Sequence, residues 1–390
     1  MTTAADLRAH ARIDHGAITA NLATVTAHLP AGTSAMVVVK ADAYGHGMVP
    51  VARTARAAGA TWLGVALPSE ALTLRAAGDG GRILAWLFPP GDPALVECLR
   101  TGVDLSAATI GTLDELAAIG EAVGRVPQVQ LKVDTGLGRG GCLAESWPDL
   151  IAHAAGLERA GRLTVTGLWS HLSCADEPDR PETSAQAEVF DLAVGQAHRA
   201  GLDPEVRHLA NSAAALTRSD LGFDLVRIGI AAYGLTPGAA LGTAAGLGLR
   251  PAMTLVARVA LTKTLPTGHA VSYGASWTAP APTRVALIPV GYADGLPRRS
   301  AGEVSIGGRR CPVLGRVAMD QCVVAVGDTG VVPGQEVIVF GDAAAGEPTA
   351  DDWGSWSATI GYEIVTRIGP RVPRVHAADG SGLNPAGADR

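Results

Sequence analysis

Three lysines stand out in a chain that otherwise uses arginine for its positive charges. Lysine and arginine total 31, and Lys40, Lys132 and Lys263 are the only lysines, which leaves 28 arginines. Arginine stays protonated in proteins, whereas a buried lysine can lose its proton and attack an aldehyde as a neutral amine. Each of these lysines is therefore a candidate for amine chemistry.

Lys40 is the strongest candidate because of its neighbours. It follows three consecutive valines, Val37–Val39, which indicate a buried strand, and a turn punctuated by Gly45 and Gly47 follows it. An ammonium group at the end of a buried strand is costly if it remains alone, and burial lowers the pKa of an amine. The competing interpretation is a lysine with a buried stem and a head group in water.

The elements that position Lys40 belong to a repeating pattern. From residue 12 to residue 236, short apolar runs alternate with stretches of good helix formers. There are eight such runs: Ala35–Lys40, Trp62–Ala66, Arg82–Leu87, Val103–Ser106, Val129–Val133, Val165–His171, Val206–Leu209 and Leu225–Ile230. This alternation predicts an α/β fold, a (β/α)8 TIM-type barrel. An open doubly wound sheet is the competitor, but no G-x-G-x-x-G follows the first strand.

Polar residues gather at the predicted carboxyl ends of these strands, where barrel enzymes carry their chemistry. They are Lys40, Tyr44, Trp86, Lys132, Asp134, Arg139, His171, Ser173, His208, Asn211, Ser212, Arg227, Gly229 and Ile230. Any one of them could equally pack or face solvent. Their convergence on one mouth of the barrel is what predicts an active site.

The alternation of apolar runs and helix-forming stretches ends after Thr236. A Gly/Ala-rich linker over residues 238–248 precedes valine-rich runs broken by Gly and Pro, namely Leu255–Leu265, Val285–Val290, Cys311–Leu314, Gln321–Val326 and Glu336–Phe340. These runs predict a second, mostly β domain. We expect a barrel over residues 11–242, a β-domain over residues 243–378 to which residues 1–10 could contribute, and a flexible tail over residues 379–390.

Composition argues against several classes of function. The net charge is −6, the pI is about 5.9 and the basic residues are scattered, so neither nucleic acid nor an anionic membrane is an expected partner. No run of 18 apolar residues predicts a membrane span, and residues 1–15 lack a secretory signal. Five cysteines without a C-x-x-C pair fit free thiols in the cytoplasm, and the dispersed histidines predict no metal site.

The stretch V-V-K-A-D-A-Y-G-H-G around Lys40 resembles the pyridoxal-phosphate lysine signature of alanine racemases. The resemblance continues in order through K-V-D-T-G-L-G-R, W-S-H-L-S, H-L-A-N-S, V-R-I-G-I-A-A-Y-G, V-S-Y-G-A-S-W, G-Y-A-D-G, G-R-V-A-M-D-Q, Y-E-I and R-V-P-R. It covers nearly the whole chain. It implies a fold-type III enzyme, with a barrel followed by a β-domain, pyridoxal 5'-phosphate as cofactor, and a head-to-tail homodimer with shared active sites.

The resemblance also implies how the cofactor is held. Lys40 forms a Schiff base with it, and Arg227 faces the pyridine nitrogen. Because arginine only donates hydrogen bonds, it keeps that nitrogen unprotonated, whereas a carboxylate there would keep it protonated. The remaining cofactor-binding residues are Tyr44, Trp86, Asn211, Ser212, Gly229, Ile230 and Tyr362. Read alone, Arg227 could instead form a surface ion pair.

Racemisation requires an acid/base group on each face of a planar intermediate. The resemblance implies that Lys40 acts on the D-enantiomer and that Tyr273, from the partner subunit, acts on the L-enantiomer of a pyridoxal-phosphate aldimine. His171 would hydrogen-bond Tyr273 and lie close to Arg227. Read alone, Tyr273 could equally be a strand tyrosine packed at an interface.

The substrate contacts implied by the resemblance lie around Arg139, which follows a Gly-x-Gly turn and would pair with the substrate carboxylate. A carbamylated Lys132 would orient this arginine. The other implied substrate-site residues are Met319 and Asp320 from the partner subunit and the entrance residues Tyr292 and Tyr362. Two positions depart from the family pattern, Ala318 and His376.

The resemblance implies an isomerase that interconverts L-alanine and D-alanine and supplies D-alanine for peptidoglycan. A broad-specificity serine racemase, a fold-type III decarboxylase, a non-catalytic pyridoxal-phosphate carrier and a ligand-sensing regulator remain as alternatives. Arg227 argues against the decarboxylases, which usually place a glutamate at the pyridine nitrogen. Tyr292 and Tyr362 argue against a wide entrance, and Tyr273 in a β-domain argues against the carrier.

Overall fold

The eight apolar runs form eight parallel strands of one sheet in the computed structural model, which describes residues 7–299 and 301–377. These strands are β2 (Ser34–Val38), β3 (Trp62–Val65), β4 (Arg82–Ala85), β5 (Asp104–Ala107), β6 (Gln128–Lys132), β7 (Thr164–Trp169), β8 (Val206–His208) and β9 (Leu225–Ile228). The order is β8-β7-β6-β5-β4-β3-β2-β9. Backbone bonds from Asp224 N to Arg207 O (3.2 Å) and from Arg227 N to Ala210 O (3.0 Å) link the two ends. The predicted (β/α)8 barrel is confirmed.

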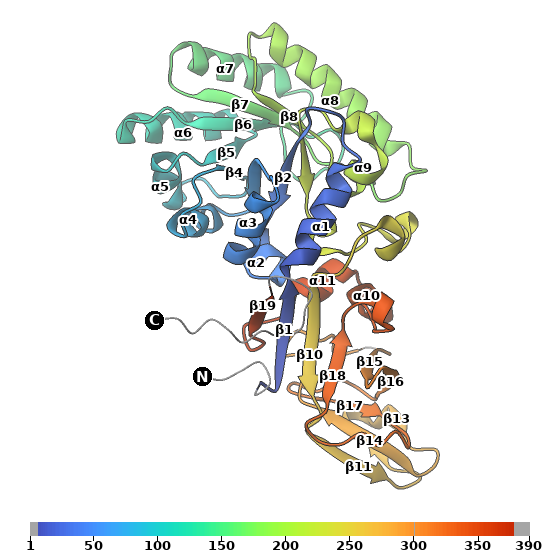
Figure 1. Ribbon diagram of the computed structural model, residues 1–390. Coiled ribbons are helices and arrows are strands. Elements are labelled where there is room, and N and C mark those ends of the chain that lie inside the picture. The colour runs from blue at the N-terminus through green and yellow to red at the C-terminus, as the bar shows by residue number, and fades with distance from the viewer. Residues whose placement is uncertain (1–6, 300, 378–390) are drawn as a thin grey trace.

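Helices cover the outside of this barrel (Figure 1). They are α1 (His15–Thr26), α2 (Lys40–Gly45), α3 (Met48–Ala57), α4 (Pro68–Ala76), α5 (Ala94–Arg100), α6 (Ile110–Val123), α7 (Trp147–Arg159), α8 (Glu182–Arg199) and α9 (Ser212–Thr217). Helix α6 shows how the local sequence sets the start, the end and the buried face of a helix. Thr109 caps its start by accepting a hydrogen bond from Thr112 N, Gly124 ends it in a left-handed conformation, and its buried face is Leu113, Leu116, Ala117 and Gly120.

A second sheet of nine strands forms the other end of the molecule (Figure 1). Its strands are β1 (Ala9–Asp14), β10 (Met253–Arg258), β11 (Leu261–Leu265), β14 (Thr283–Ile288), β15 (Glu303–Ile306), β16 (Arg309–Leu314), β17 (Cys322–Ala325), β18 (Glu336–Phe340) and β19 (Arg374–Ala377). Strand β1 pairs antiparallel with β10 and parallel with β19. The first strand of the chain therefore completes the sheet built by its last third.

Smaller elements complete the second part of the chain. They are the hairpin β12 (Ala270–Val271) and β13 (Trp277–Thr278), the helices α10 (Ala350–Trp356) and α11 (Gly361–Thr366), and the 3₁₀ turns η2 (Ser219–Leu221), η3 (Ile230–Tyr233), η4 (Ala239–Leu241), η5 (Ala245–Leu247), η6 (Tyr273–Ala275) and η7 (Ala343–Ala345). The mostly β second domain is confirmed. The two helices were not expected from the sequence, and the predicted tail, residues 379–390, lies outside the described residues.

The second part of the chain braces the segment that follows Lys40. Helix α11 packs on α2, and a β-carbon at Gly45 would lie 2.5 Å from the carbonyl oxygen of Val365. Arg374 donates from Nε to the carbonyl oxygen of Gly45 at 2.8 Å. Nδ1 of His376 lies 2.9 Å from Nε2 of His15 on α1. The position of Lys40 thus depends on contacts with both ends of the chain.

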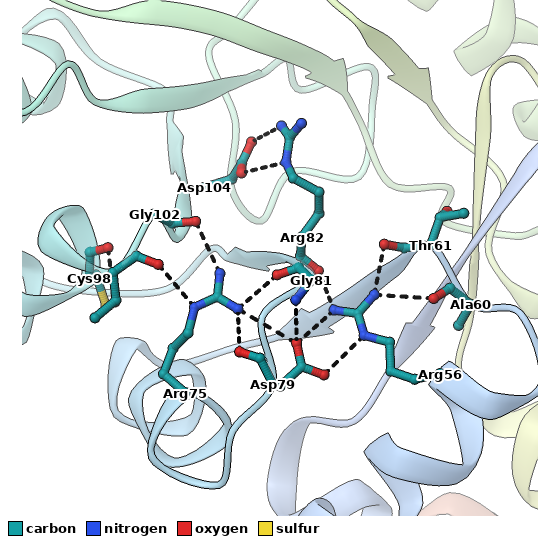
Figure 2. Close-up of polar contacts among 11 residues, drawn as sticks. Arg56, Ala60, Thr61, Arg75, Asp79, Gly81, Arg82, Cys98, Gly102 and Asp104 are labelled. Atoms are coloured by element: carbon teal, nitrogen blue, oxygen red, sulfur yellow. Dashed lines mark hydrogen bonds and ion pairs between the residues drawn. The ribbon is translucent and has the colours of Figure 1, made fainter.

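An arginine-rich cluster closes the barrel at the end opposite the strand carboxyl termini (Figure 2). Arg56 and Arg75 lie on either side of Asp79, with shortest N–O distances of 2.9 and 3.5 Å, and Arg82 makes a 2.9 Å ion pair with Asp104. Residues at this end of a TIM-type barrel usually serve stability. Arg82 and Asp104 open β4 and β5, so this pair also reaches the barrel interior.

Across the described ranges, no helix combines the length and apolarity that a membrane span requires. In the same ranges, no three His, Cys, Asp or Glu side chains come together as a metal site would need.

Candidate active site

A cavity of about 280 Å³ opens at the carboxyl ends of the barrel strands. It is lined by Val38, Lys40, Tyr44, Trp86, Lys132, Arg139, Trp169, His171, Asn211, Ser212, Arg227, Gly229, Ile230 and Tyr362. All of these except Val38 and Trp169 are residues that the sequence analysis singled out. Trp169 lies at the end of β7 within the quoted W-S-H-L-S motif, and that strand-end position was the signal that could have found it.

The wall of this cavity carries four basic side chains, Lys40, Lys132, Arg139 and Arg227, and no carboxylate from residues 7–299 or 301–377. Burial, followed by the charge of Arg139, lowers the pKa of Lys40, while Glu70 acts in the opposite direction. Burial, followed by the charges of Arg227 and Arg139, lowers the pKa of Lys132 to about 8. Such a concentration of positive charge favours an anionic ligand, and it shifts both amines toward their neutral forms.

Lys40 begins α2, whose next four residues form a left-handed helical turn. Residues 41–44 have φ of 52–54° and ψ of 37–52°, and none of them is glycine. This conformation costs roughly 1–2 kcal/mol per residue because the β-carbon crowds the following carbonyl oxygen. A run of four such residues persists only where its surroundings fix it. The turn presents both Lys40 and Tyr44 to the cavity.

Two carboxylates hold the turn in place. Asp42 accepts a hydrogen bond from Met48 N at 2.7 Å, which joins the turn to α3. Glu70, at the start of α4, accepts from Ala41 N at 2.6 Å with Oε1 and from Ala66 N and Leu67 N at 3.0 Å each with Oε2. Glu70 was not singled out by the sequence analysis, because its partner lies 29 residues away in the chain.

Hydroxyl and backbone N–H groups converge at one end of the cavity around Gly229. Ser212 Oγ accepts hydrogen bonds from Gly229 N at 2.9 Å and Ala231 N at 3.4 Å. A β-carbon at Gly229 would lie 2.6 Å from the phenol oxygen of Tyr44. Burial raises the pKa of Tyr44 and of Tyr362, so both phenols stay protonated as hydrogen-bond donors. The hydroxyl of Ser212 and the two phenols of this cradle supply O–H donors of the kind that a phosphate accepts.

Arg227 lies across the centre of the cavity floor with its guanidinium group fixed. Nη1 donates to the carbonyl oxygen of His208 at 3.0 Å and to His208 Nδ1 at 3.1 Å. Nη2 donates to the carbonyl oxygens of Ser170 (2.8 Å) and Leu209 (2.9 Å), and lies 3.2 Å from His171 Nδ1. Burial lowers the pKa of Arg227 to about 9, which leaves it charged at neutral pH.

The loop that carries Arg139 is ordered by Asp134, which follows β6. One carboxylate oxygen of Asp134 accepts hydrogen bonds from Gly136 N and Leu137 N at 3.0 Å and from Gly138 N at 3.2 Å. This pattern returns the loop to the cavity wall, where Arg139 lines it. Lys132 Nζ lies 4.3 Å from the ring centroid of Trp169, an arrangement that orients the amine inward.

Four predicted residues lie outside this cavity in the described chain. Tyr273 in η6 is 64% exposed and Met319 is 52% exposed. Tyr273 lines a separate hollow in the β-domain, Tyr292 is also exposed, and Asp320 pairs with Arg371 at 2.8 Å. One subunit therefore supplies the lysine side of the predicted site and not the tyrosine side.

The barrel, the β-domain and the cationic pocket together define a barrel protein with an anion-binding site at the strand carboxyl ends. Family models described as "Alanine racemase, N-terminal domain" and "Alanine racemase, C-terminal domain" match residues 13–237 and 252–376. The alanine racemase of Streptomyces coelicolor is 51% identical over 95% of this chain and 96% of its own length. That of Thermobifida fusca is 52% identical over 94% of this chain and 98% of its own length. The chain belongs to the alanine racemase family.

A solved structure agrees with this assignment over the whole fold. The crystal structure of alanine racemase from D-cycloserine-producing Streptomyces lavendulae matches with a TM-score of 0.93 and 50% identity, covering 95% of this chain and 97% of that chain. The family depends on pyridoxal 5'-phosphate, and the pocket fits this cofactor. Among the described residues, Nε is the guanidinium nitrogen of Arg227 without a hydrogen-bond partner. A β-carbon at Gly229 would press on the phenol of Tyr44, so glycine keeps this end of the pocket open.

Proposed function

We propose that this chain interconverts L-alanine and D-alanine with pyridoxal phosphate. The observation that best supports this is the charge of the pocket, where Lys40 lies among Lys132, Arg139 and Arg227 without a carboxylate on the wall. A cofactor phosphate and a substrate carboxylate are the anions that such a wall would bind. The D-alanine that is formed would supply peptidoglycan.

Lys40 would hold the cofactor covalently through Nζ, and its lowered pKa favours the neutral amine that this bond requires. When bound, pyridoxal phosphate withdraws electrons from the α-carbon of an amino acid and makes the α-proton removable. Arg227 would donate from Nε to the ring nitrogen and hold it unprotonated. The remaining cofactor ligands would be Tyr44, Trp86, Asn211, Ser212, Gly229, Ile230 and Tyr362.

Two groups on opposite faces of the α-carbon would move the proton. Lys40 Nζ would remove it from D-alanine, and the phenol oxygen of Tyr273 of the partner subunit would remove it from L-alanine. His171 supports this arrangement, because burial and the charge of Arg227 hold its pKa well below the usual range. The neutral His171 ring accepts from Arg227 at Nδ1, so its Nε2–H can donate to Tyr273 of the partner subunit.

The same placement supports our proposal of a homodimer with shared active sites. The exposed positions of Tyr273 and Met319 on the β-domain support a role on another copy of the chain, since neither lines the Lys40 cavity. In a head-to-tail dimer, Tyr273 of the partner subunit would complete the site together with its Met319, Asp320 and Tyr292. We place this dimer in the cytoplasm, which is consistent with five free cysteines.

Lys132 would carry a carbamate that orients Arg139. The neutral amine attacks carbon dioxide to form an N–C bond, and one proton leaves the nitrogen. The pKa of about 8 supports this step, because a substantial fraction of the amine is neutral in mildly alkaline solution. The added negative charge would pair with Arg139 and leave that guanidinium aimed at the substrate carboxylate.

The deciding experiment incubates the purified holoenzyme with L-alanine and separates the alanine enantiomers by chiral chromatography, with L-serine as comparator. We expect D-alanine to form, and to form faster than D-serine forms from L-serine. Preferential serine turnover would indicate a broad-specificity racemase instead. Release of carbon dioxide from the amino acid would indicate a decarboxylase, and retained cofactor absorbance without turnover would indicate a carrier.

A further inference from the structure

A chain of hydrogen-bonded side chains crosses the barrel interior from the active site to the opposite end. It runs from Arg227 on β9 through His208 on β8 and Gln130 on β6 to Asp104 on β5, where Arg82 on β4 meets it. His208, Gln130 and Asp104 are fully buried, with 0% exposure. Barrel interiors are usually filled by branched apolar side chains, and buried polar groups are costly unless every one is paired.

Each link in this chain has hydrogen-bond geometry. Arg227 Nη1 lies 3.1 Å from His208 Nδ1, and His208 Nε2 lies 2.7 Å from Gln130 Oε1. Gln130 Nε2 donates to Asp104 Oδ2 at 3.3 Å. Arg82 grips the same carboxylate with two nitrogens, Nε at 3.2 Å and Nη2 at 2.9 Å, as Figure 2 shows. The links are therefore continuous from Arg82 to Arg227.

The direction of every hydrogen bond is fixed from the Asp104 end. Arg82, Gln130 and Thr166 all donate to this carboxylate, the last at 2.6 Å, and a carboxylate has no proton to return. Gln130 must therefore turn its NH₂ group toward Asp104 and its carbonyl oxygen toward His208. The carbonyl oxygen can only accept, so the proton of the His208 ring must lie on Nε2.

This tautomer is the one that Arg227 needs. Burial and the charge of Arg227 hold the pKa of His208 far below its ordinary value, so the ring is neutral. With the proton on Nε2, the lone pair of Nδ1 faces Arg227 and accepts from Nη1. The other tautomer would set an N–H of His208 against an N–H of Arg227. Stacking on Trp169, with the two ring centroids 5.6 Å apart, restricts reorientation of the His208 ring.

We propose that Asp104 is a positioning residue that sets the tautomer of His208 through Gln130 and thereby fixes the guanidinium plane of Arg227. With His208 as an acceptor, both protons of Nη1 are held, and the carbonyl oxygens of Ser170 and Leu209 share the two protons of Nη2 with His171 Nδ1. Nε–H is then left for the cofactor nitrogen. The inference rests on the proposed role of Arg227 and extends it to the far end of the barrel.

The test combines kinetics with nitrogen-15 NMR of histidine-labelled holoenzyme, which distinguishes protonated from unprotonated ring nitrogens. The His208 signals are assigned by their loss in His208→Asn. In the unmodified enzyme we expect a neutral ring protonated at Nε2. The amide of Asp104→Asn can turn either its oxygen or its NH₂ group toward Gln130, so the orientation of Gln130 is no longer fixed. We therefore expect an Nδ1–H population and a roughly tenfold or larger loss of kcat with a smaller change in KM.

Thr166→Val is the matched control, because it removes another buried hydrogen bond to Asp104 without altering Gln130. We expect it to lower the melting temperature while leaving the Nε2–H tautomer and kcat unchanged. Gln130→Met breaks the link without touching the Arg82 ion pair and should reproduce the effect of Asp104→Asn. Gln130→Met therefore still tests the inference if Asp104→Asn does not fold.

Any of three results would overturn the inference. The first is a His208 ring that is protonated at Nδ1, or at both nitrogens, in the unmodified enzyme. The second is an unchanged tautomer and kcat in both Asp104→Asn and Gln130→Met, and the third is a loss of kcat in Thr166→Val as large as that in Asp104→Asn. The tautomer is read without turnover. Failure to racemise alanine would therefore remove the proposed function, whereas an Nδ1–H ring in an active racemase would remove only this inference.

Discussion

The carboxylate of Glu70 offers a direct test of how the left-handed turn presents Lys40. Glu70 accepts three backbone hydrogen bonds with two oxygens, one from Ala41 N at 2.6 Å and two from Ala66 N and Leu67 N at 3.0 Å each. Glutamine has one acceptor oxygen, and its NH₂ group would face an N–H donor. Glu70→Gln must therefore lose the bond to Ala41 or both of the others.

The expected magnitude follows from the cost of the turn. Four left-handed residues cost about 4–8 kcal/mol together, and a hydrogen bond to a charged group contributes about 1.5–3 kcal/mol. Losing the bond to Ala41 therefore lowers the population of the turn by roughly 10- to 100-fold relative to its alternatives. We expect kcat/KM for alanine to fall about tenfold or more.

The pH profile of the variant reports how the charge of Glu70 affects the pKa of Lys40. The charge of Glu70 raises the pKa of Lys40, against the larger lowering by burial. Removing that charge lowers the pKa further, so Lys40 stays neutral to lower pH. Because Lys40 is the proposed base for D-alanine, the acid limb of the kcat profile with D-alanine should move to lower pH in Glu70→Gln.

Glu115→Gln is the control, because Glu115 also accepts a backbone hydrogen bond, from Gly91 N at 2.6 Å, away from the cavity. We expect its kinetics to match those of the unmodified enzyme. The reasoning fails if Glu70→Gln keeps full kcat/KM, if Glu115→Gln loses as much, or if the acid limb moves to higher pH.

Three further outcomes are expected. Mixing inactive Lys40→Ala and Tyr273→Phe subunits should restore part of the activity, since half of the sites in a heterodimer would combine intact residues; heterodimers without activity would contradict shared sites. Gly229→Ala places a β-carbon 2.6 Å from the Tyr44 phenol oxygen, so cofactor affinity measured by absorbance should fall at least tenfold, and unchanged affinity would refute the cradle. Removing carbon dioxide should lower activity reversibly, and reloading at a fixed carbon dioxide pressure should be faster as pH rises toward about 8, the pKa of Lys132; an insensitive enzyme would contradict the carbamate.

Much of the fold and of the site was predictable because the signals are local. Three valines before Lys40 indicate a buried strand whatever lies elsewhere, and eight such runs separated by helix formers leave few alternatives to a barrel. Strand-end positions then bring Lys132, His171 and Arg227 to one mouth. These predictions hold because burial periodicity and strand direction are properties of short segments.

Other features depend on residues that meet only after the chain closes. No glycine marks the left-handed turn at residues 41–44 in the sequence. Glu70 of α4 binds Ala41 N at its start, and Arg374 of β19 binds the carbonyl oxygen of Gly45 just after it. Strand β1 was not expected to pair with β19, because the two lie at opposite ends of the sequence.

The sequence by itself determined which side chains could do chemistry and on which strands they lie. The tertiary structure alone decided their protonation and orientation. Asp104 and His208 are 104 residues apart, yet barrel closure places Gln130 between them and so fixes the direction of each hydrogen bond. Such coupling depends on distances of about 3 Å across neighbouring strands, which the spacing of residues along a chain does not specify.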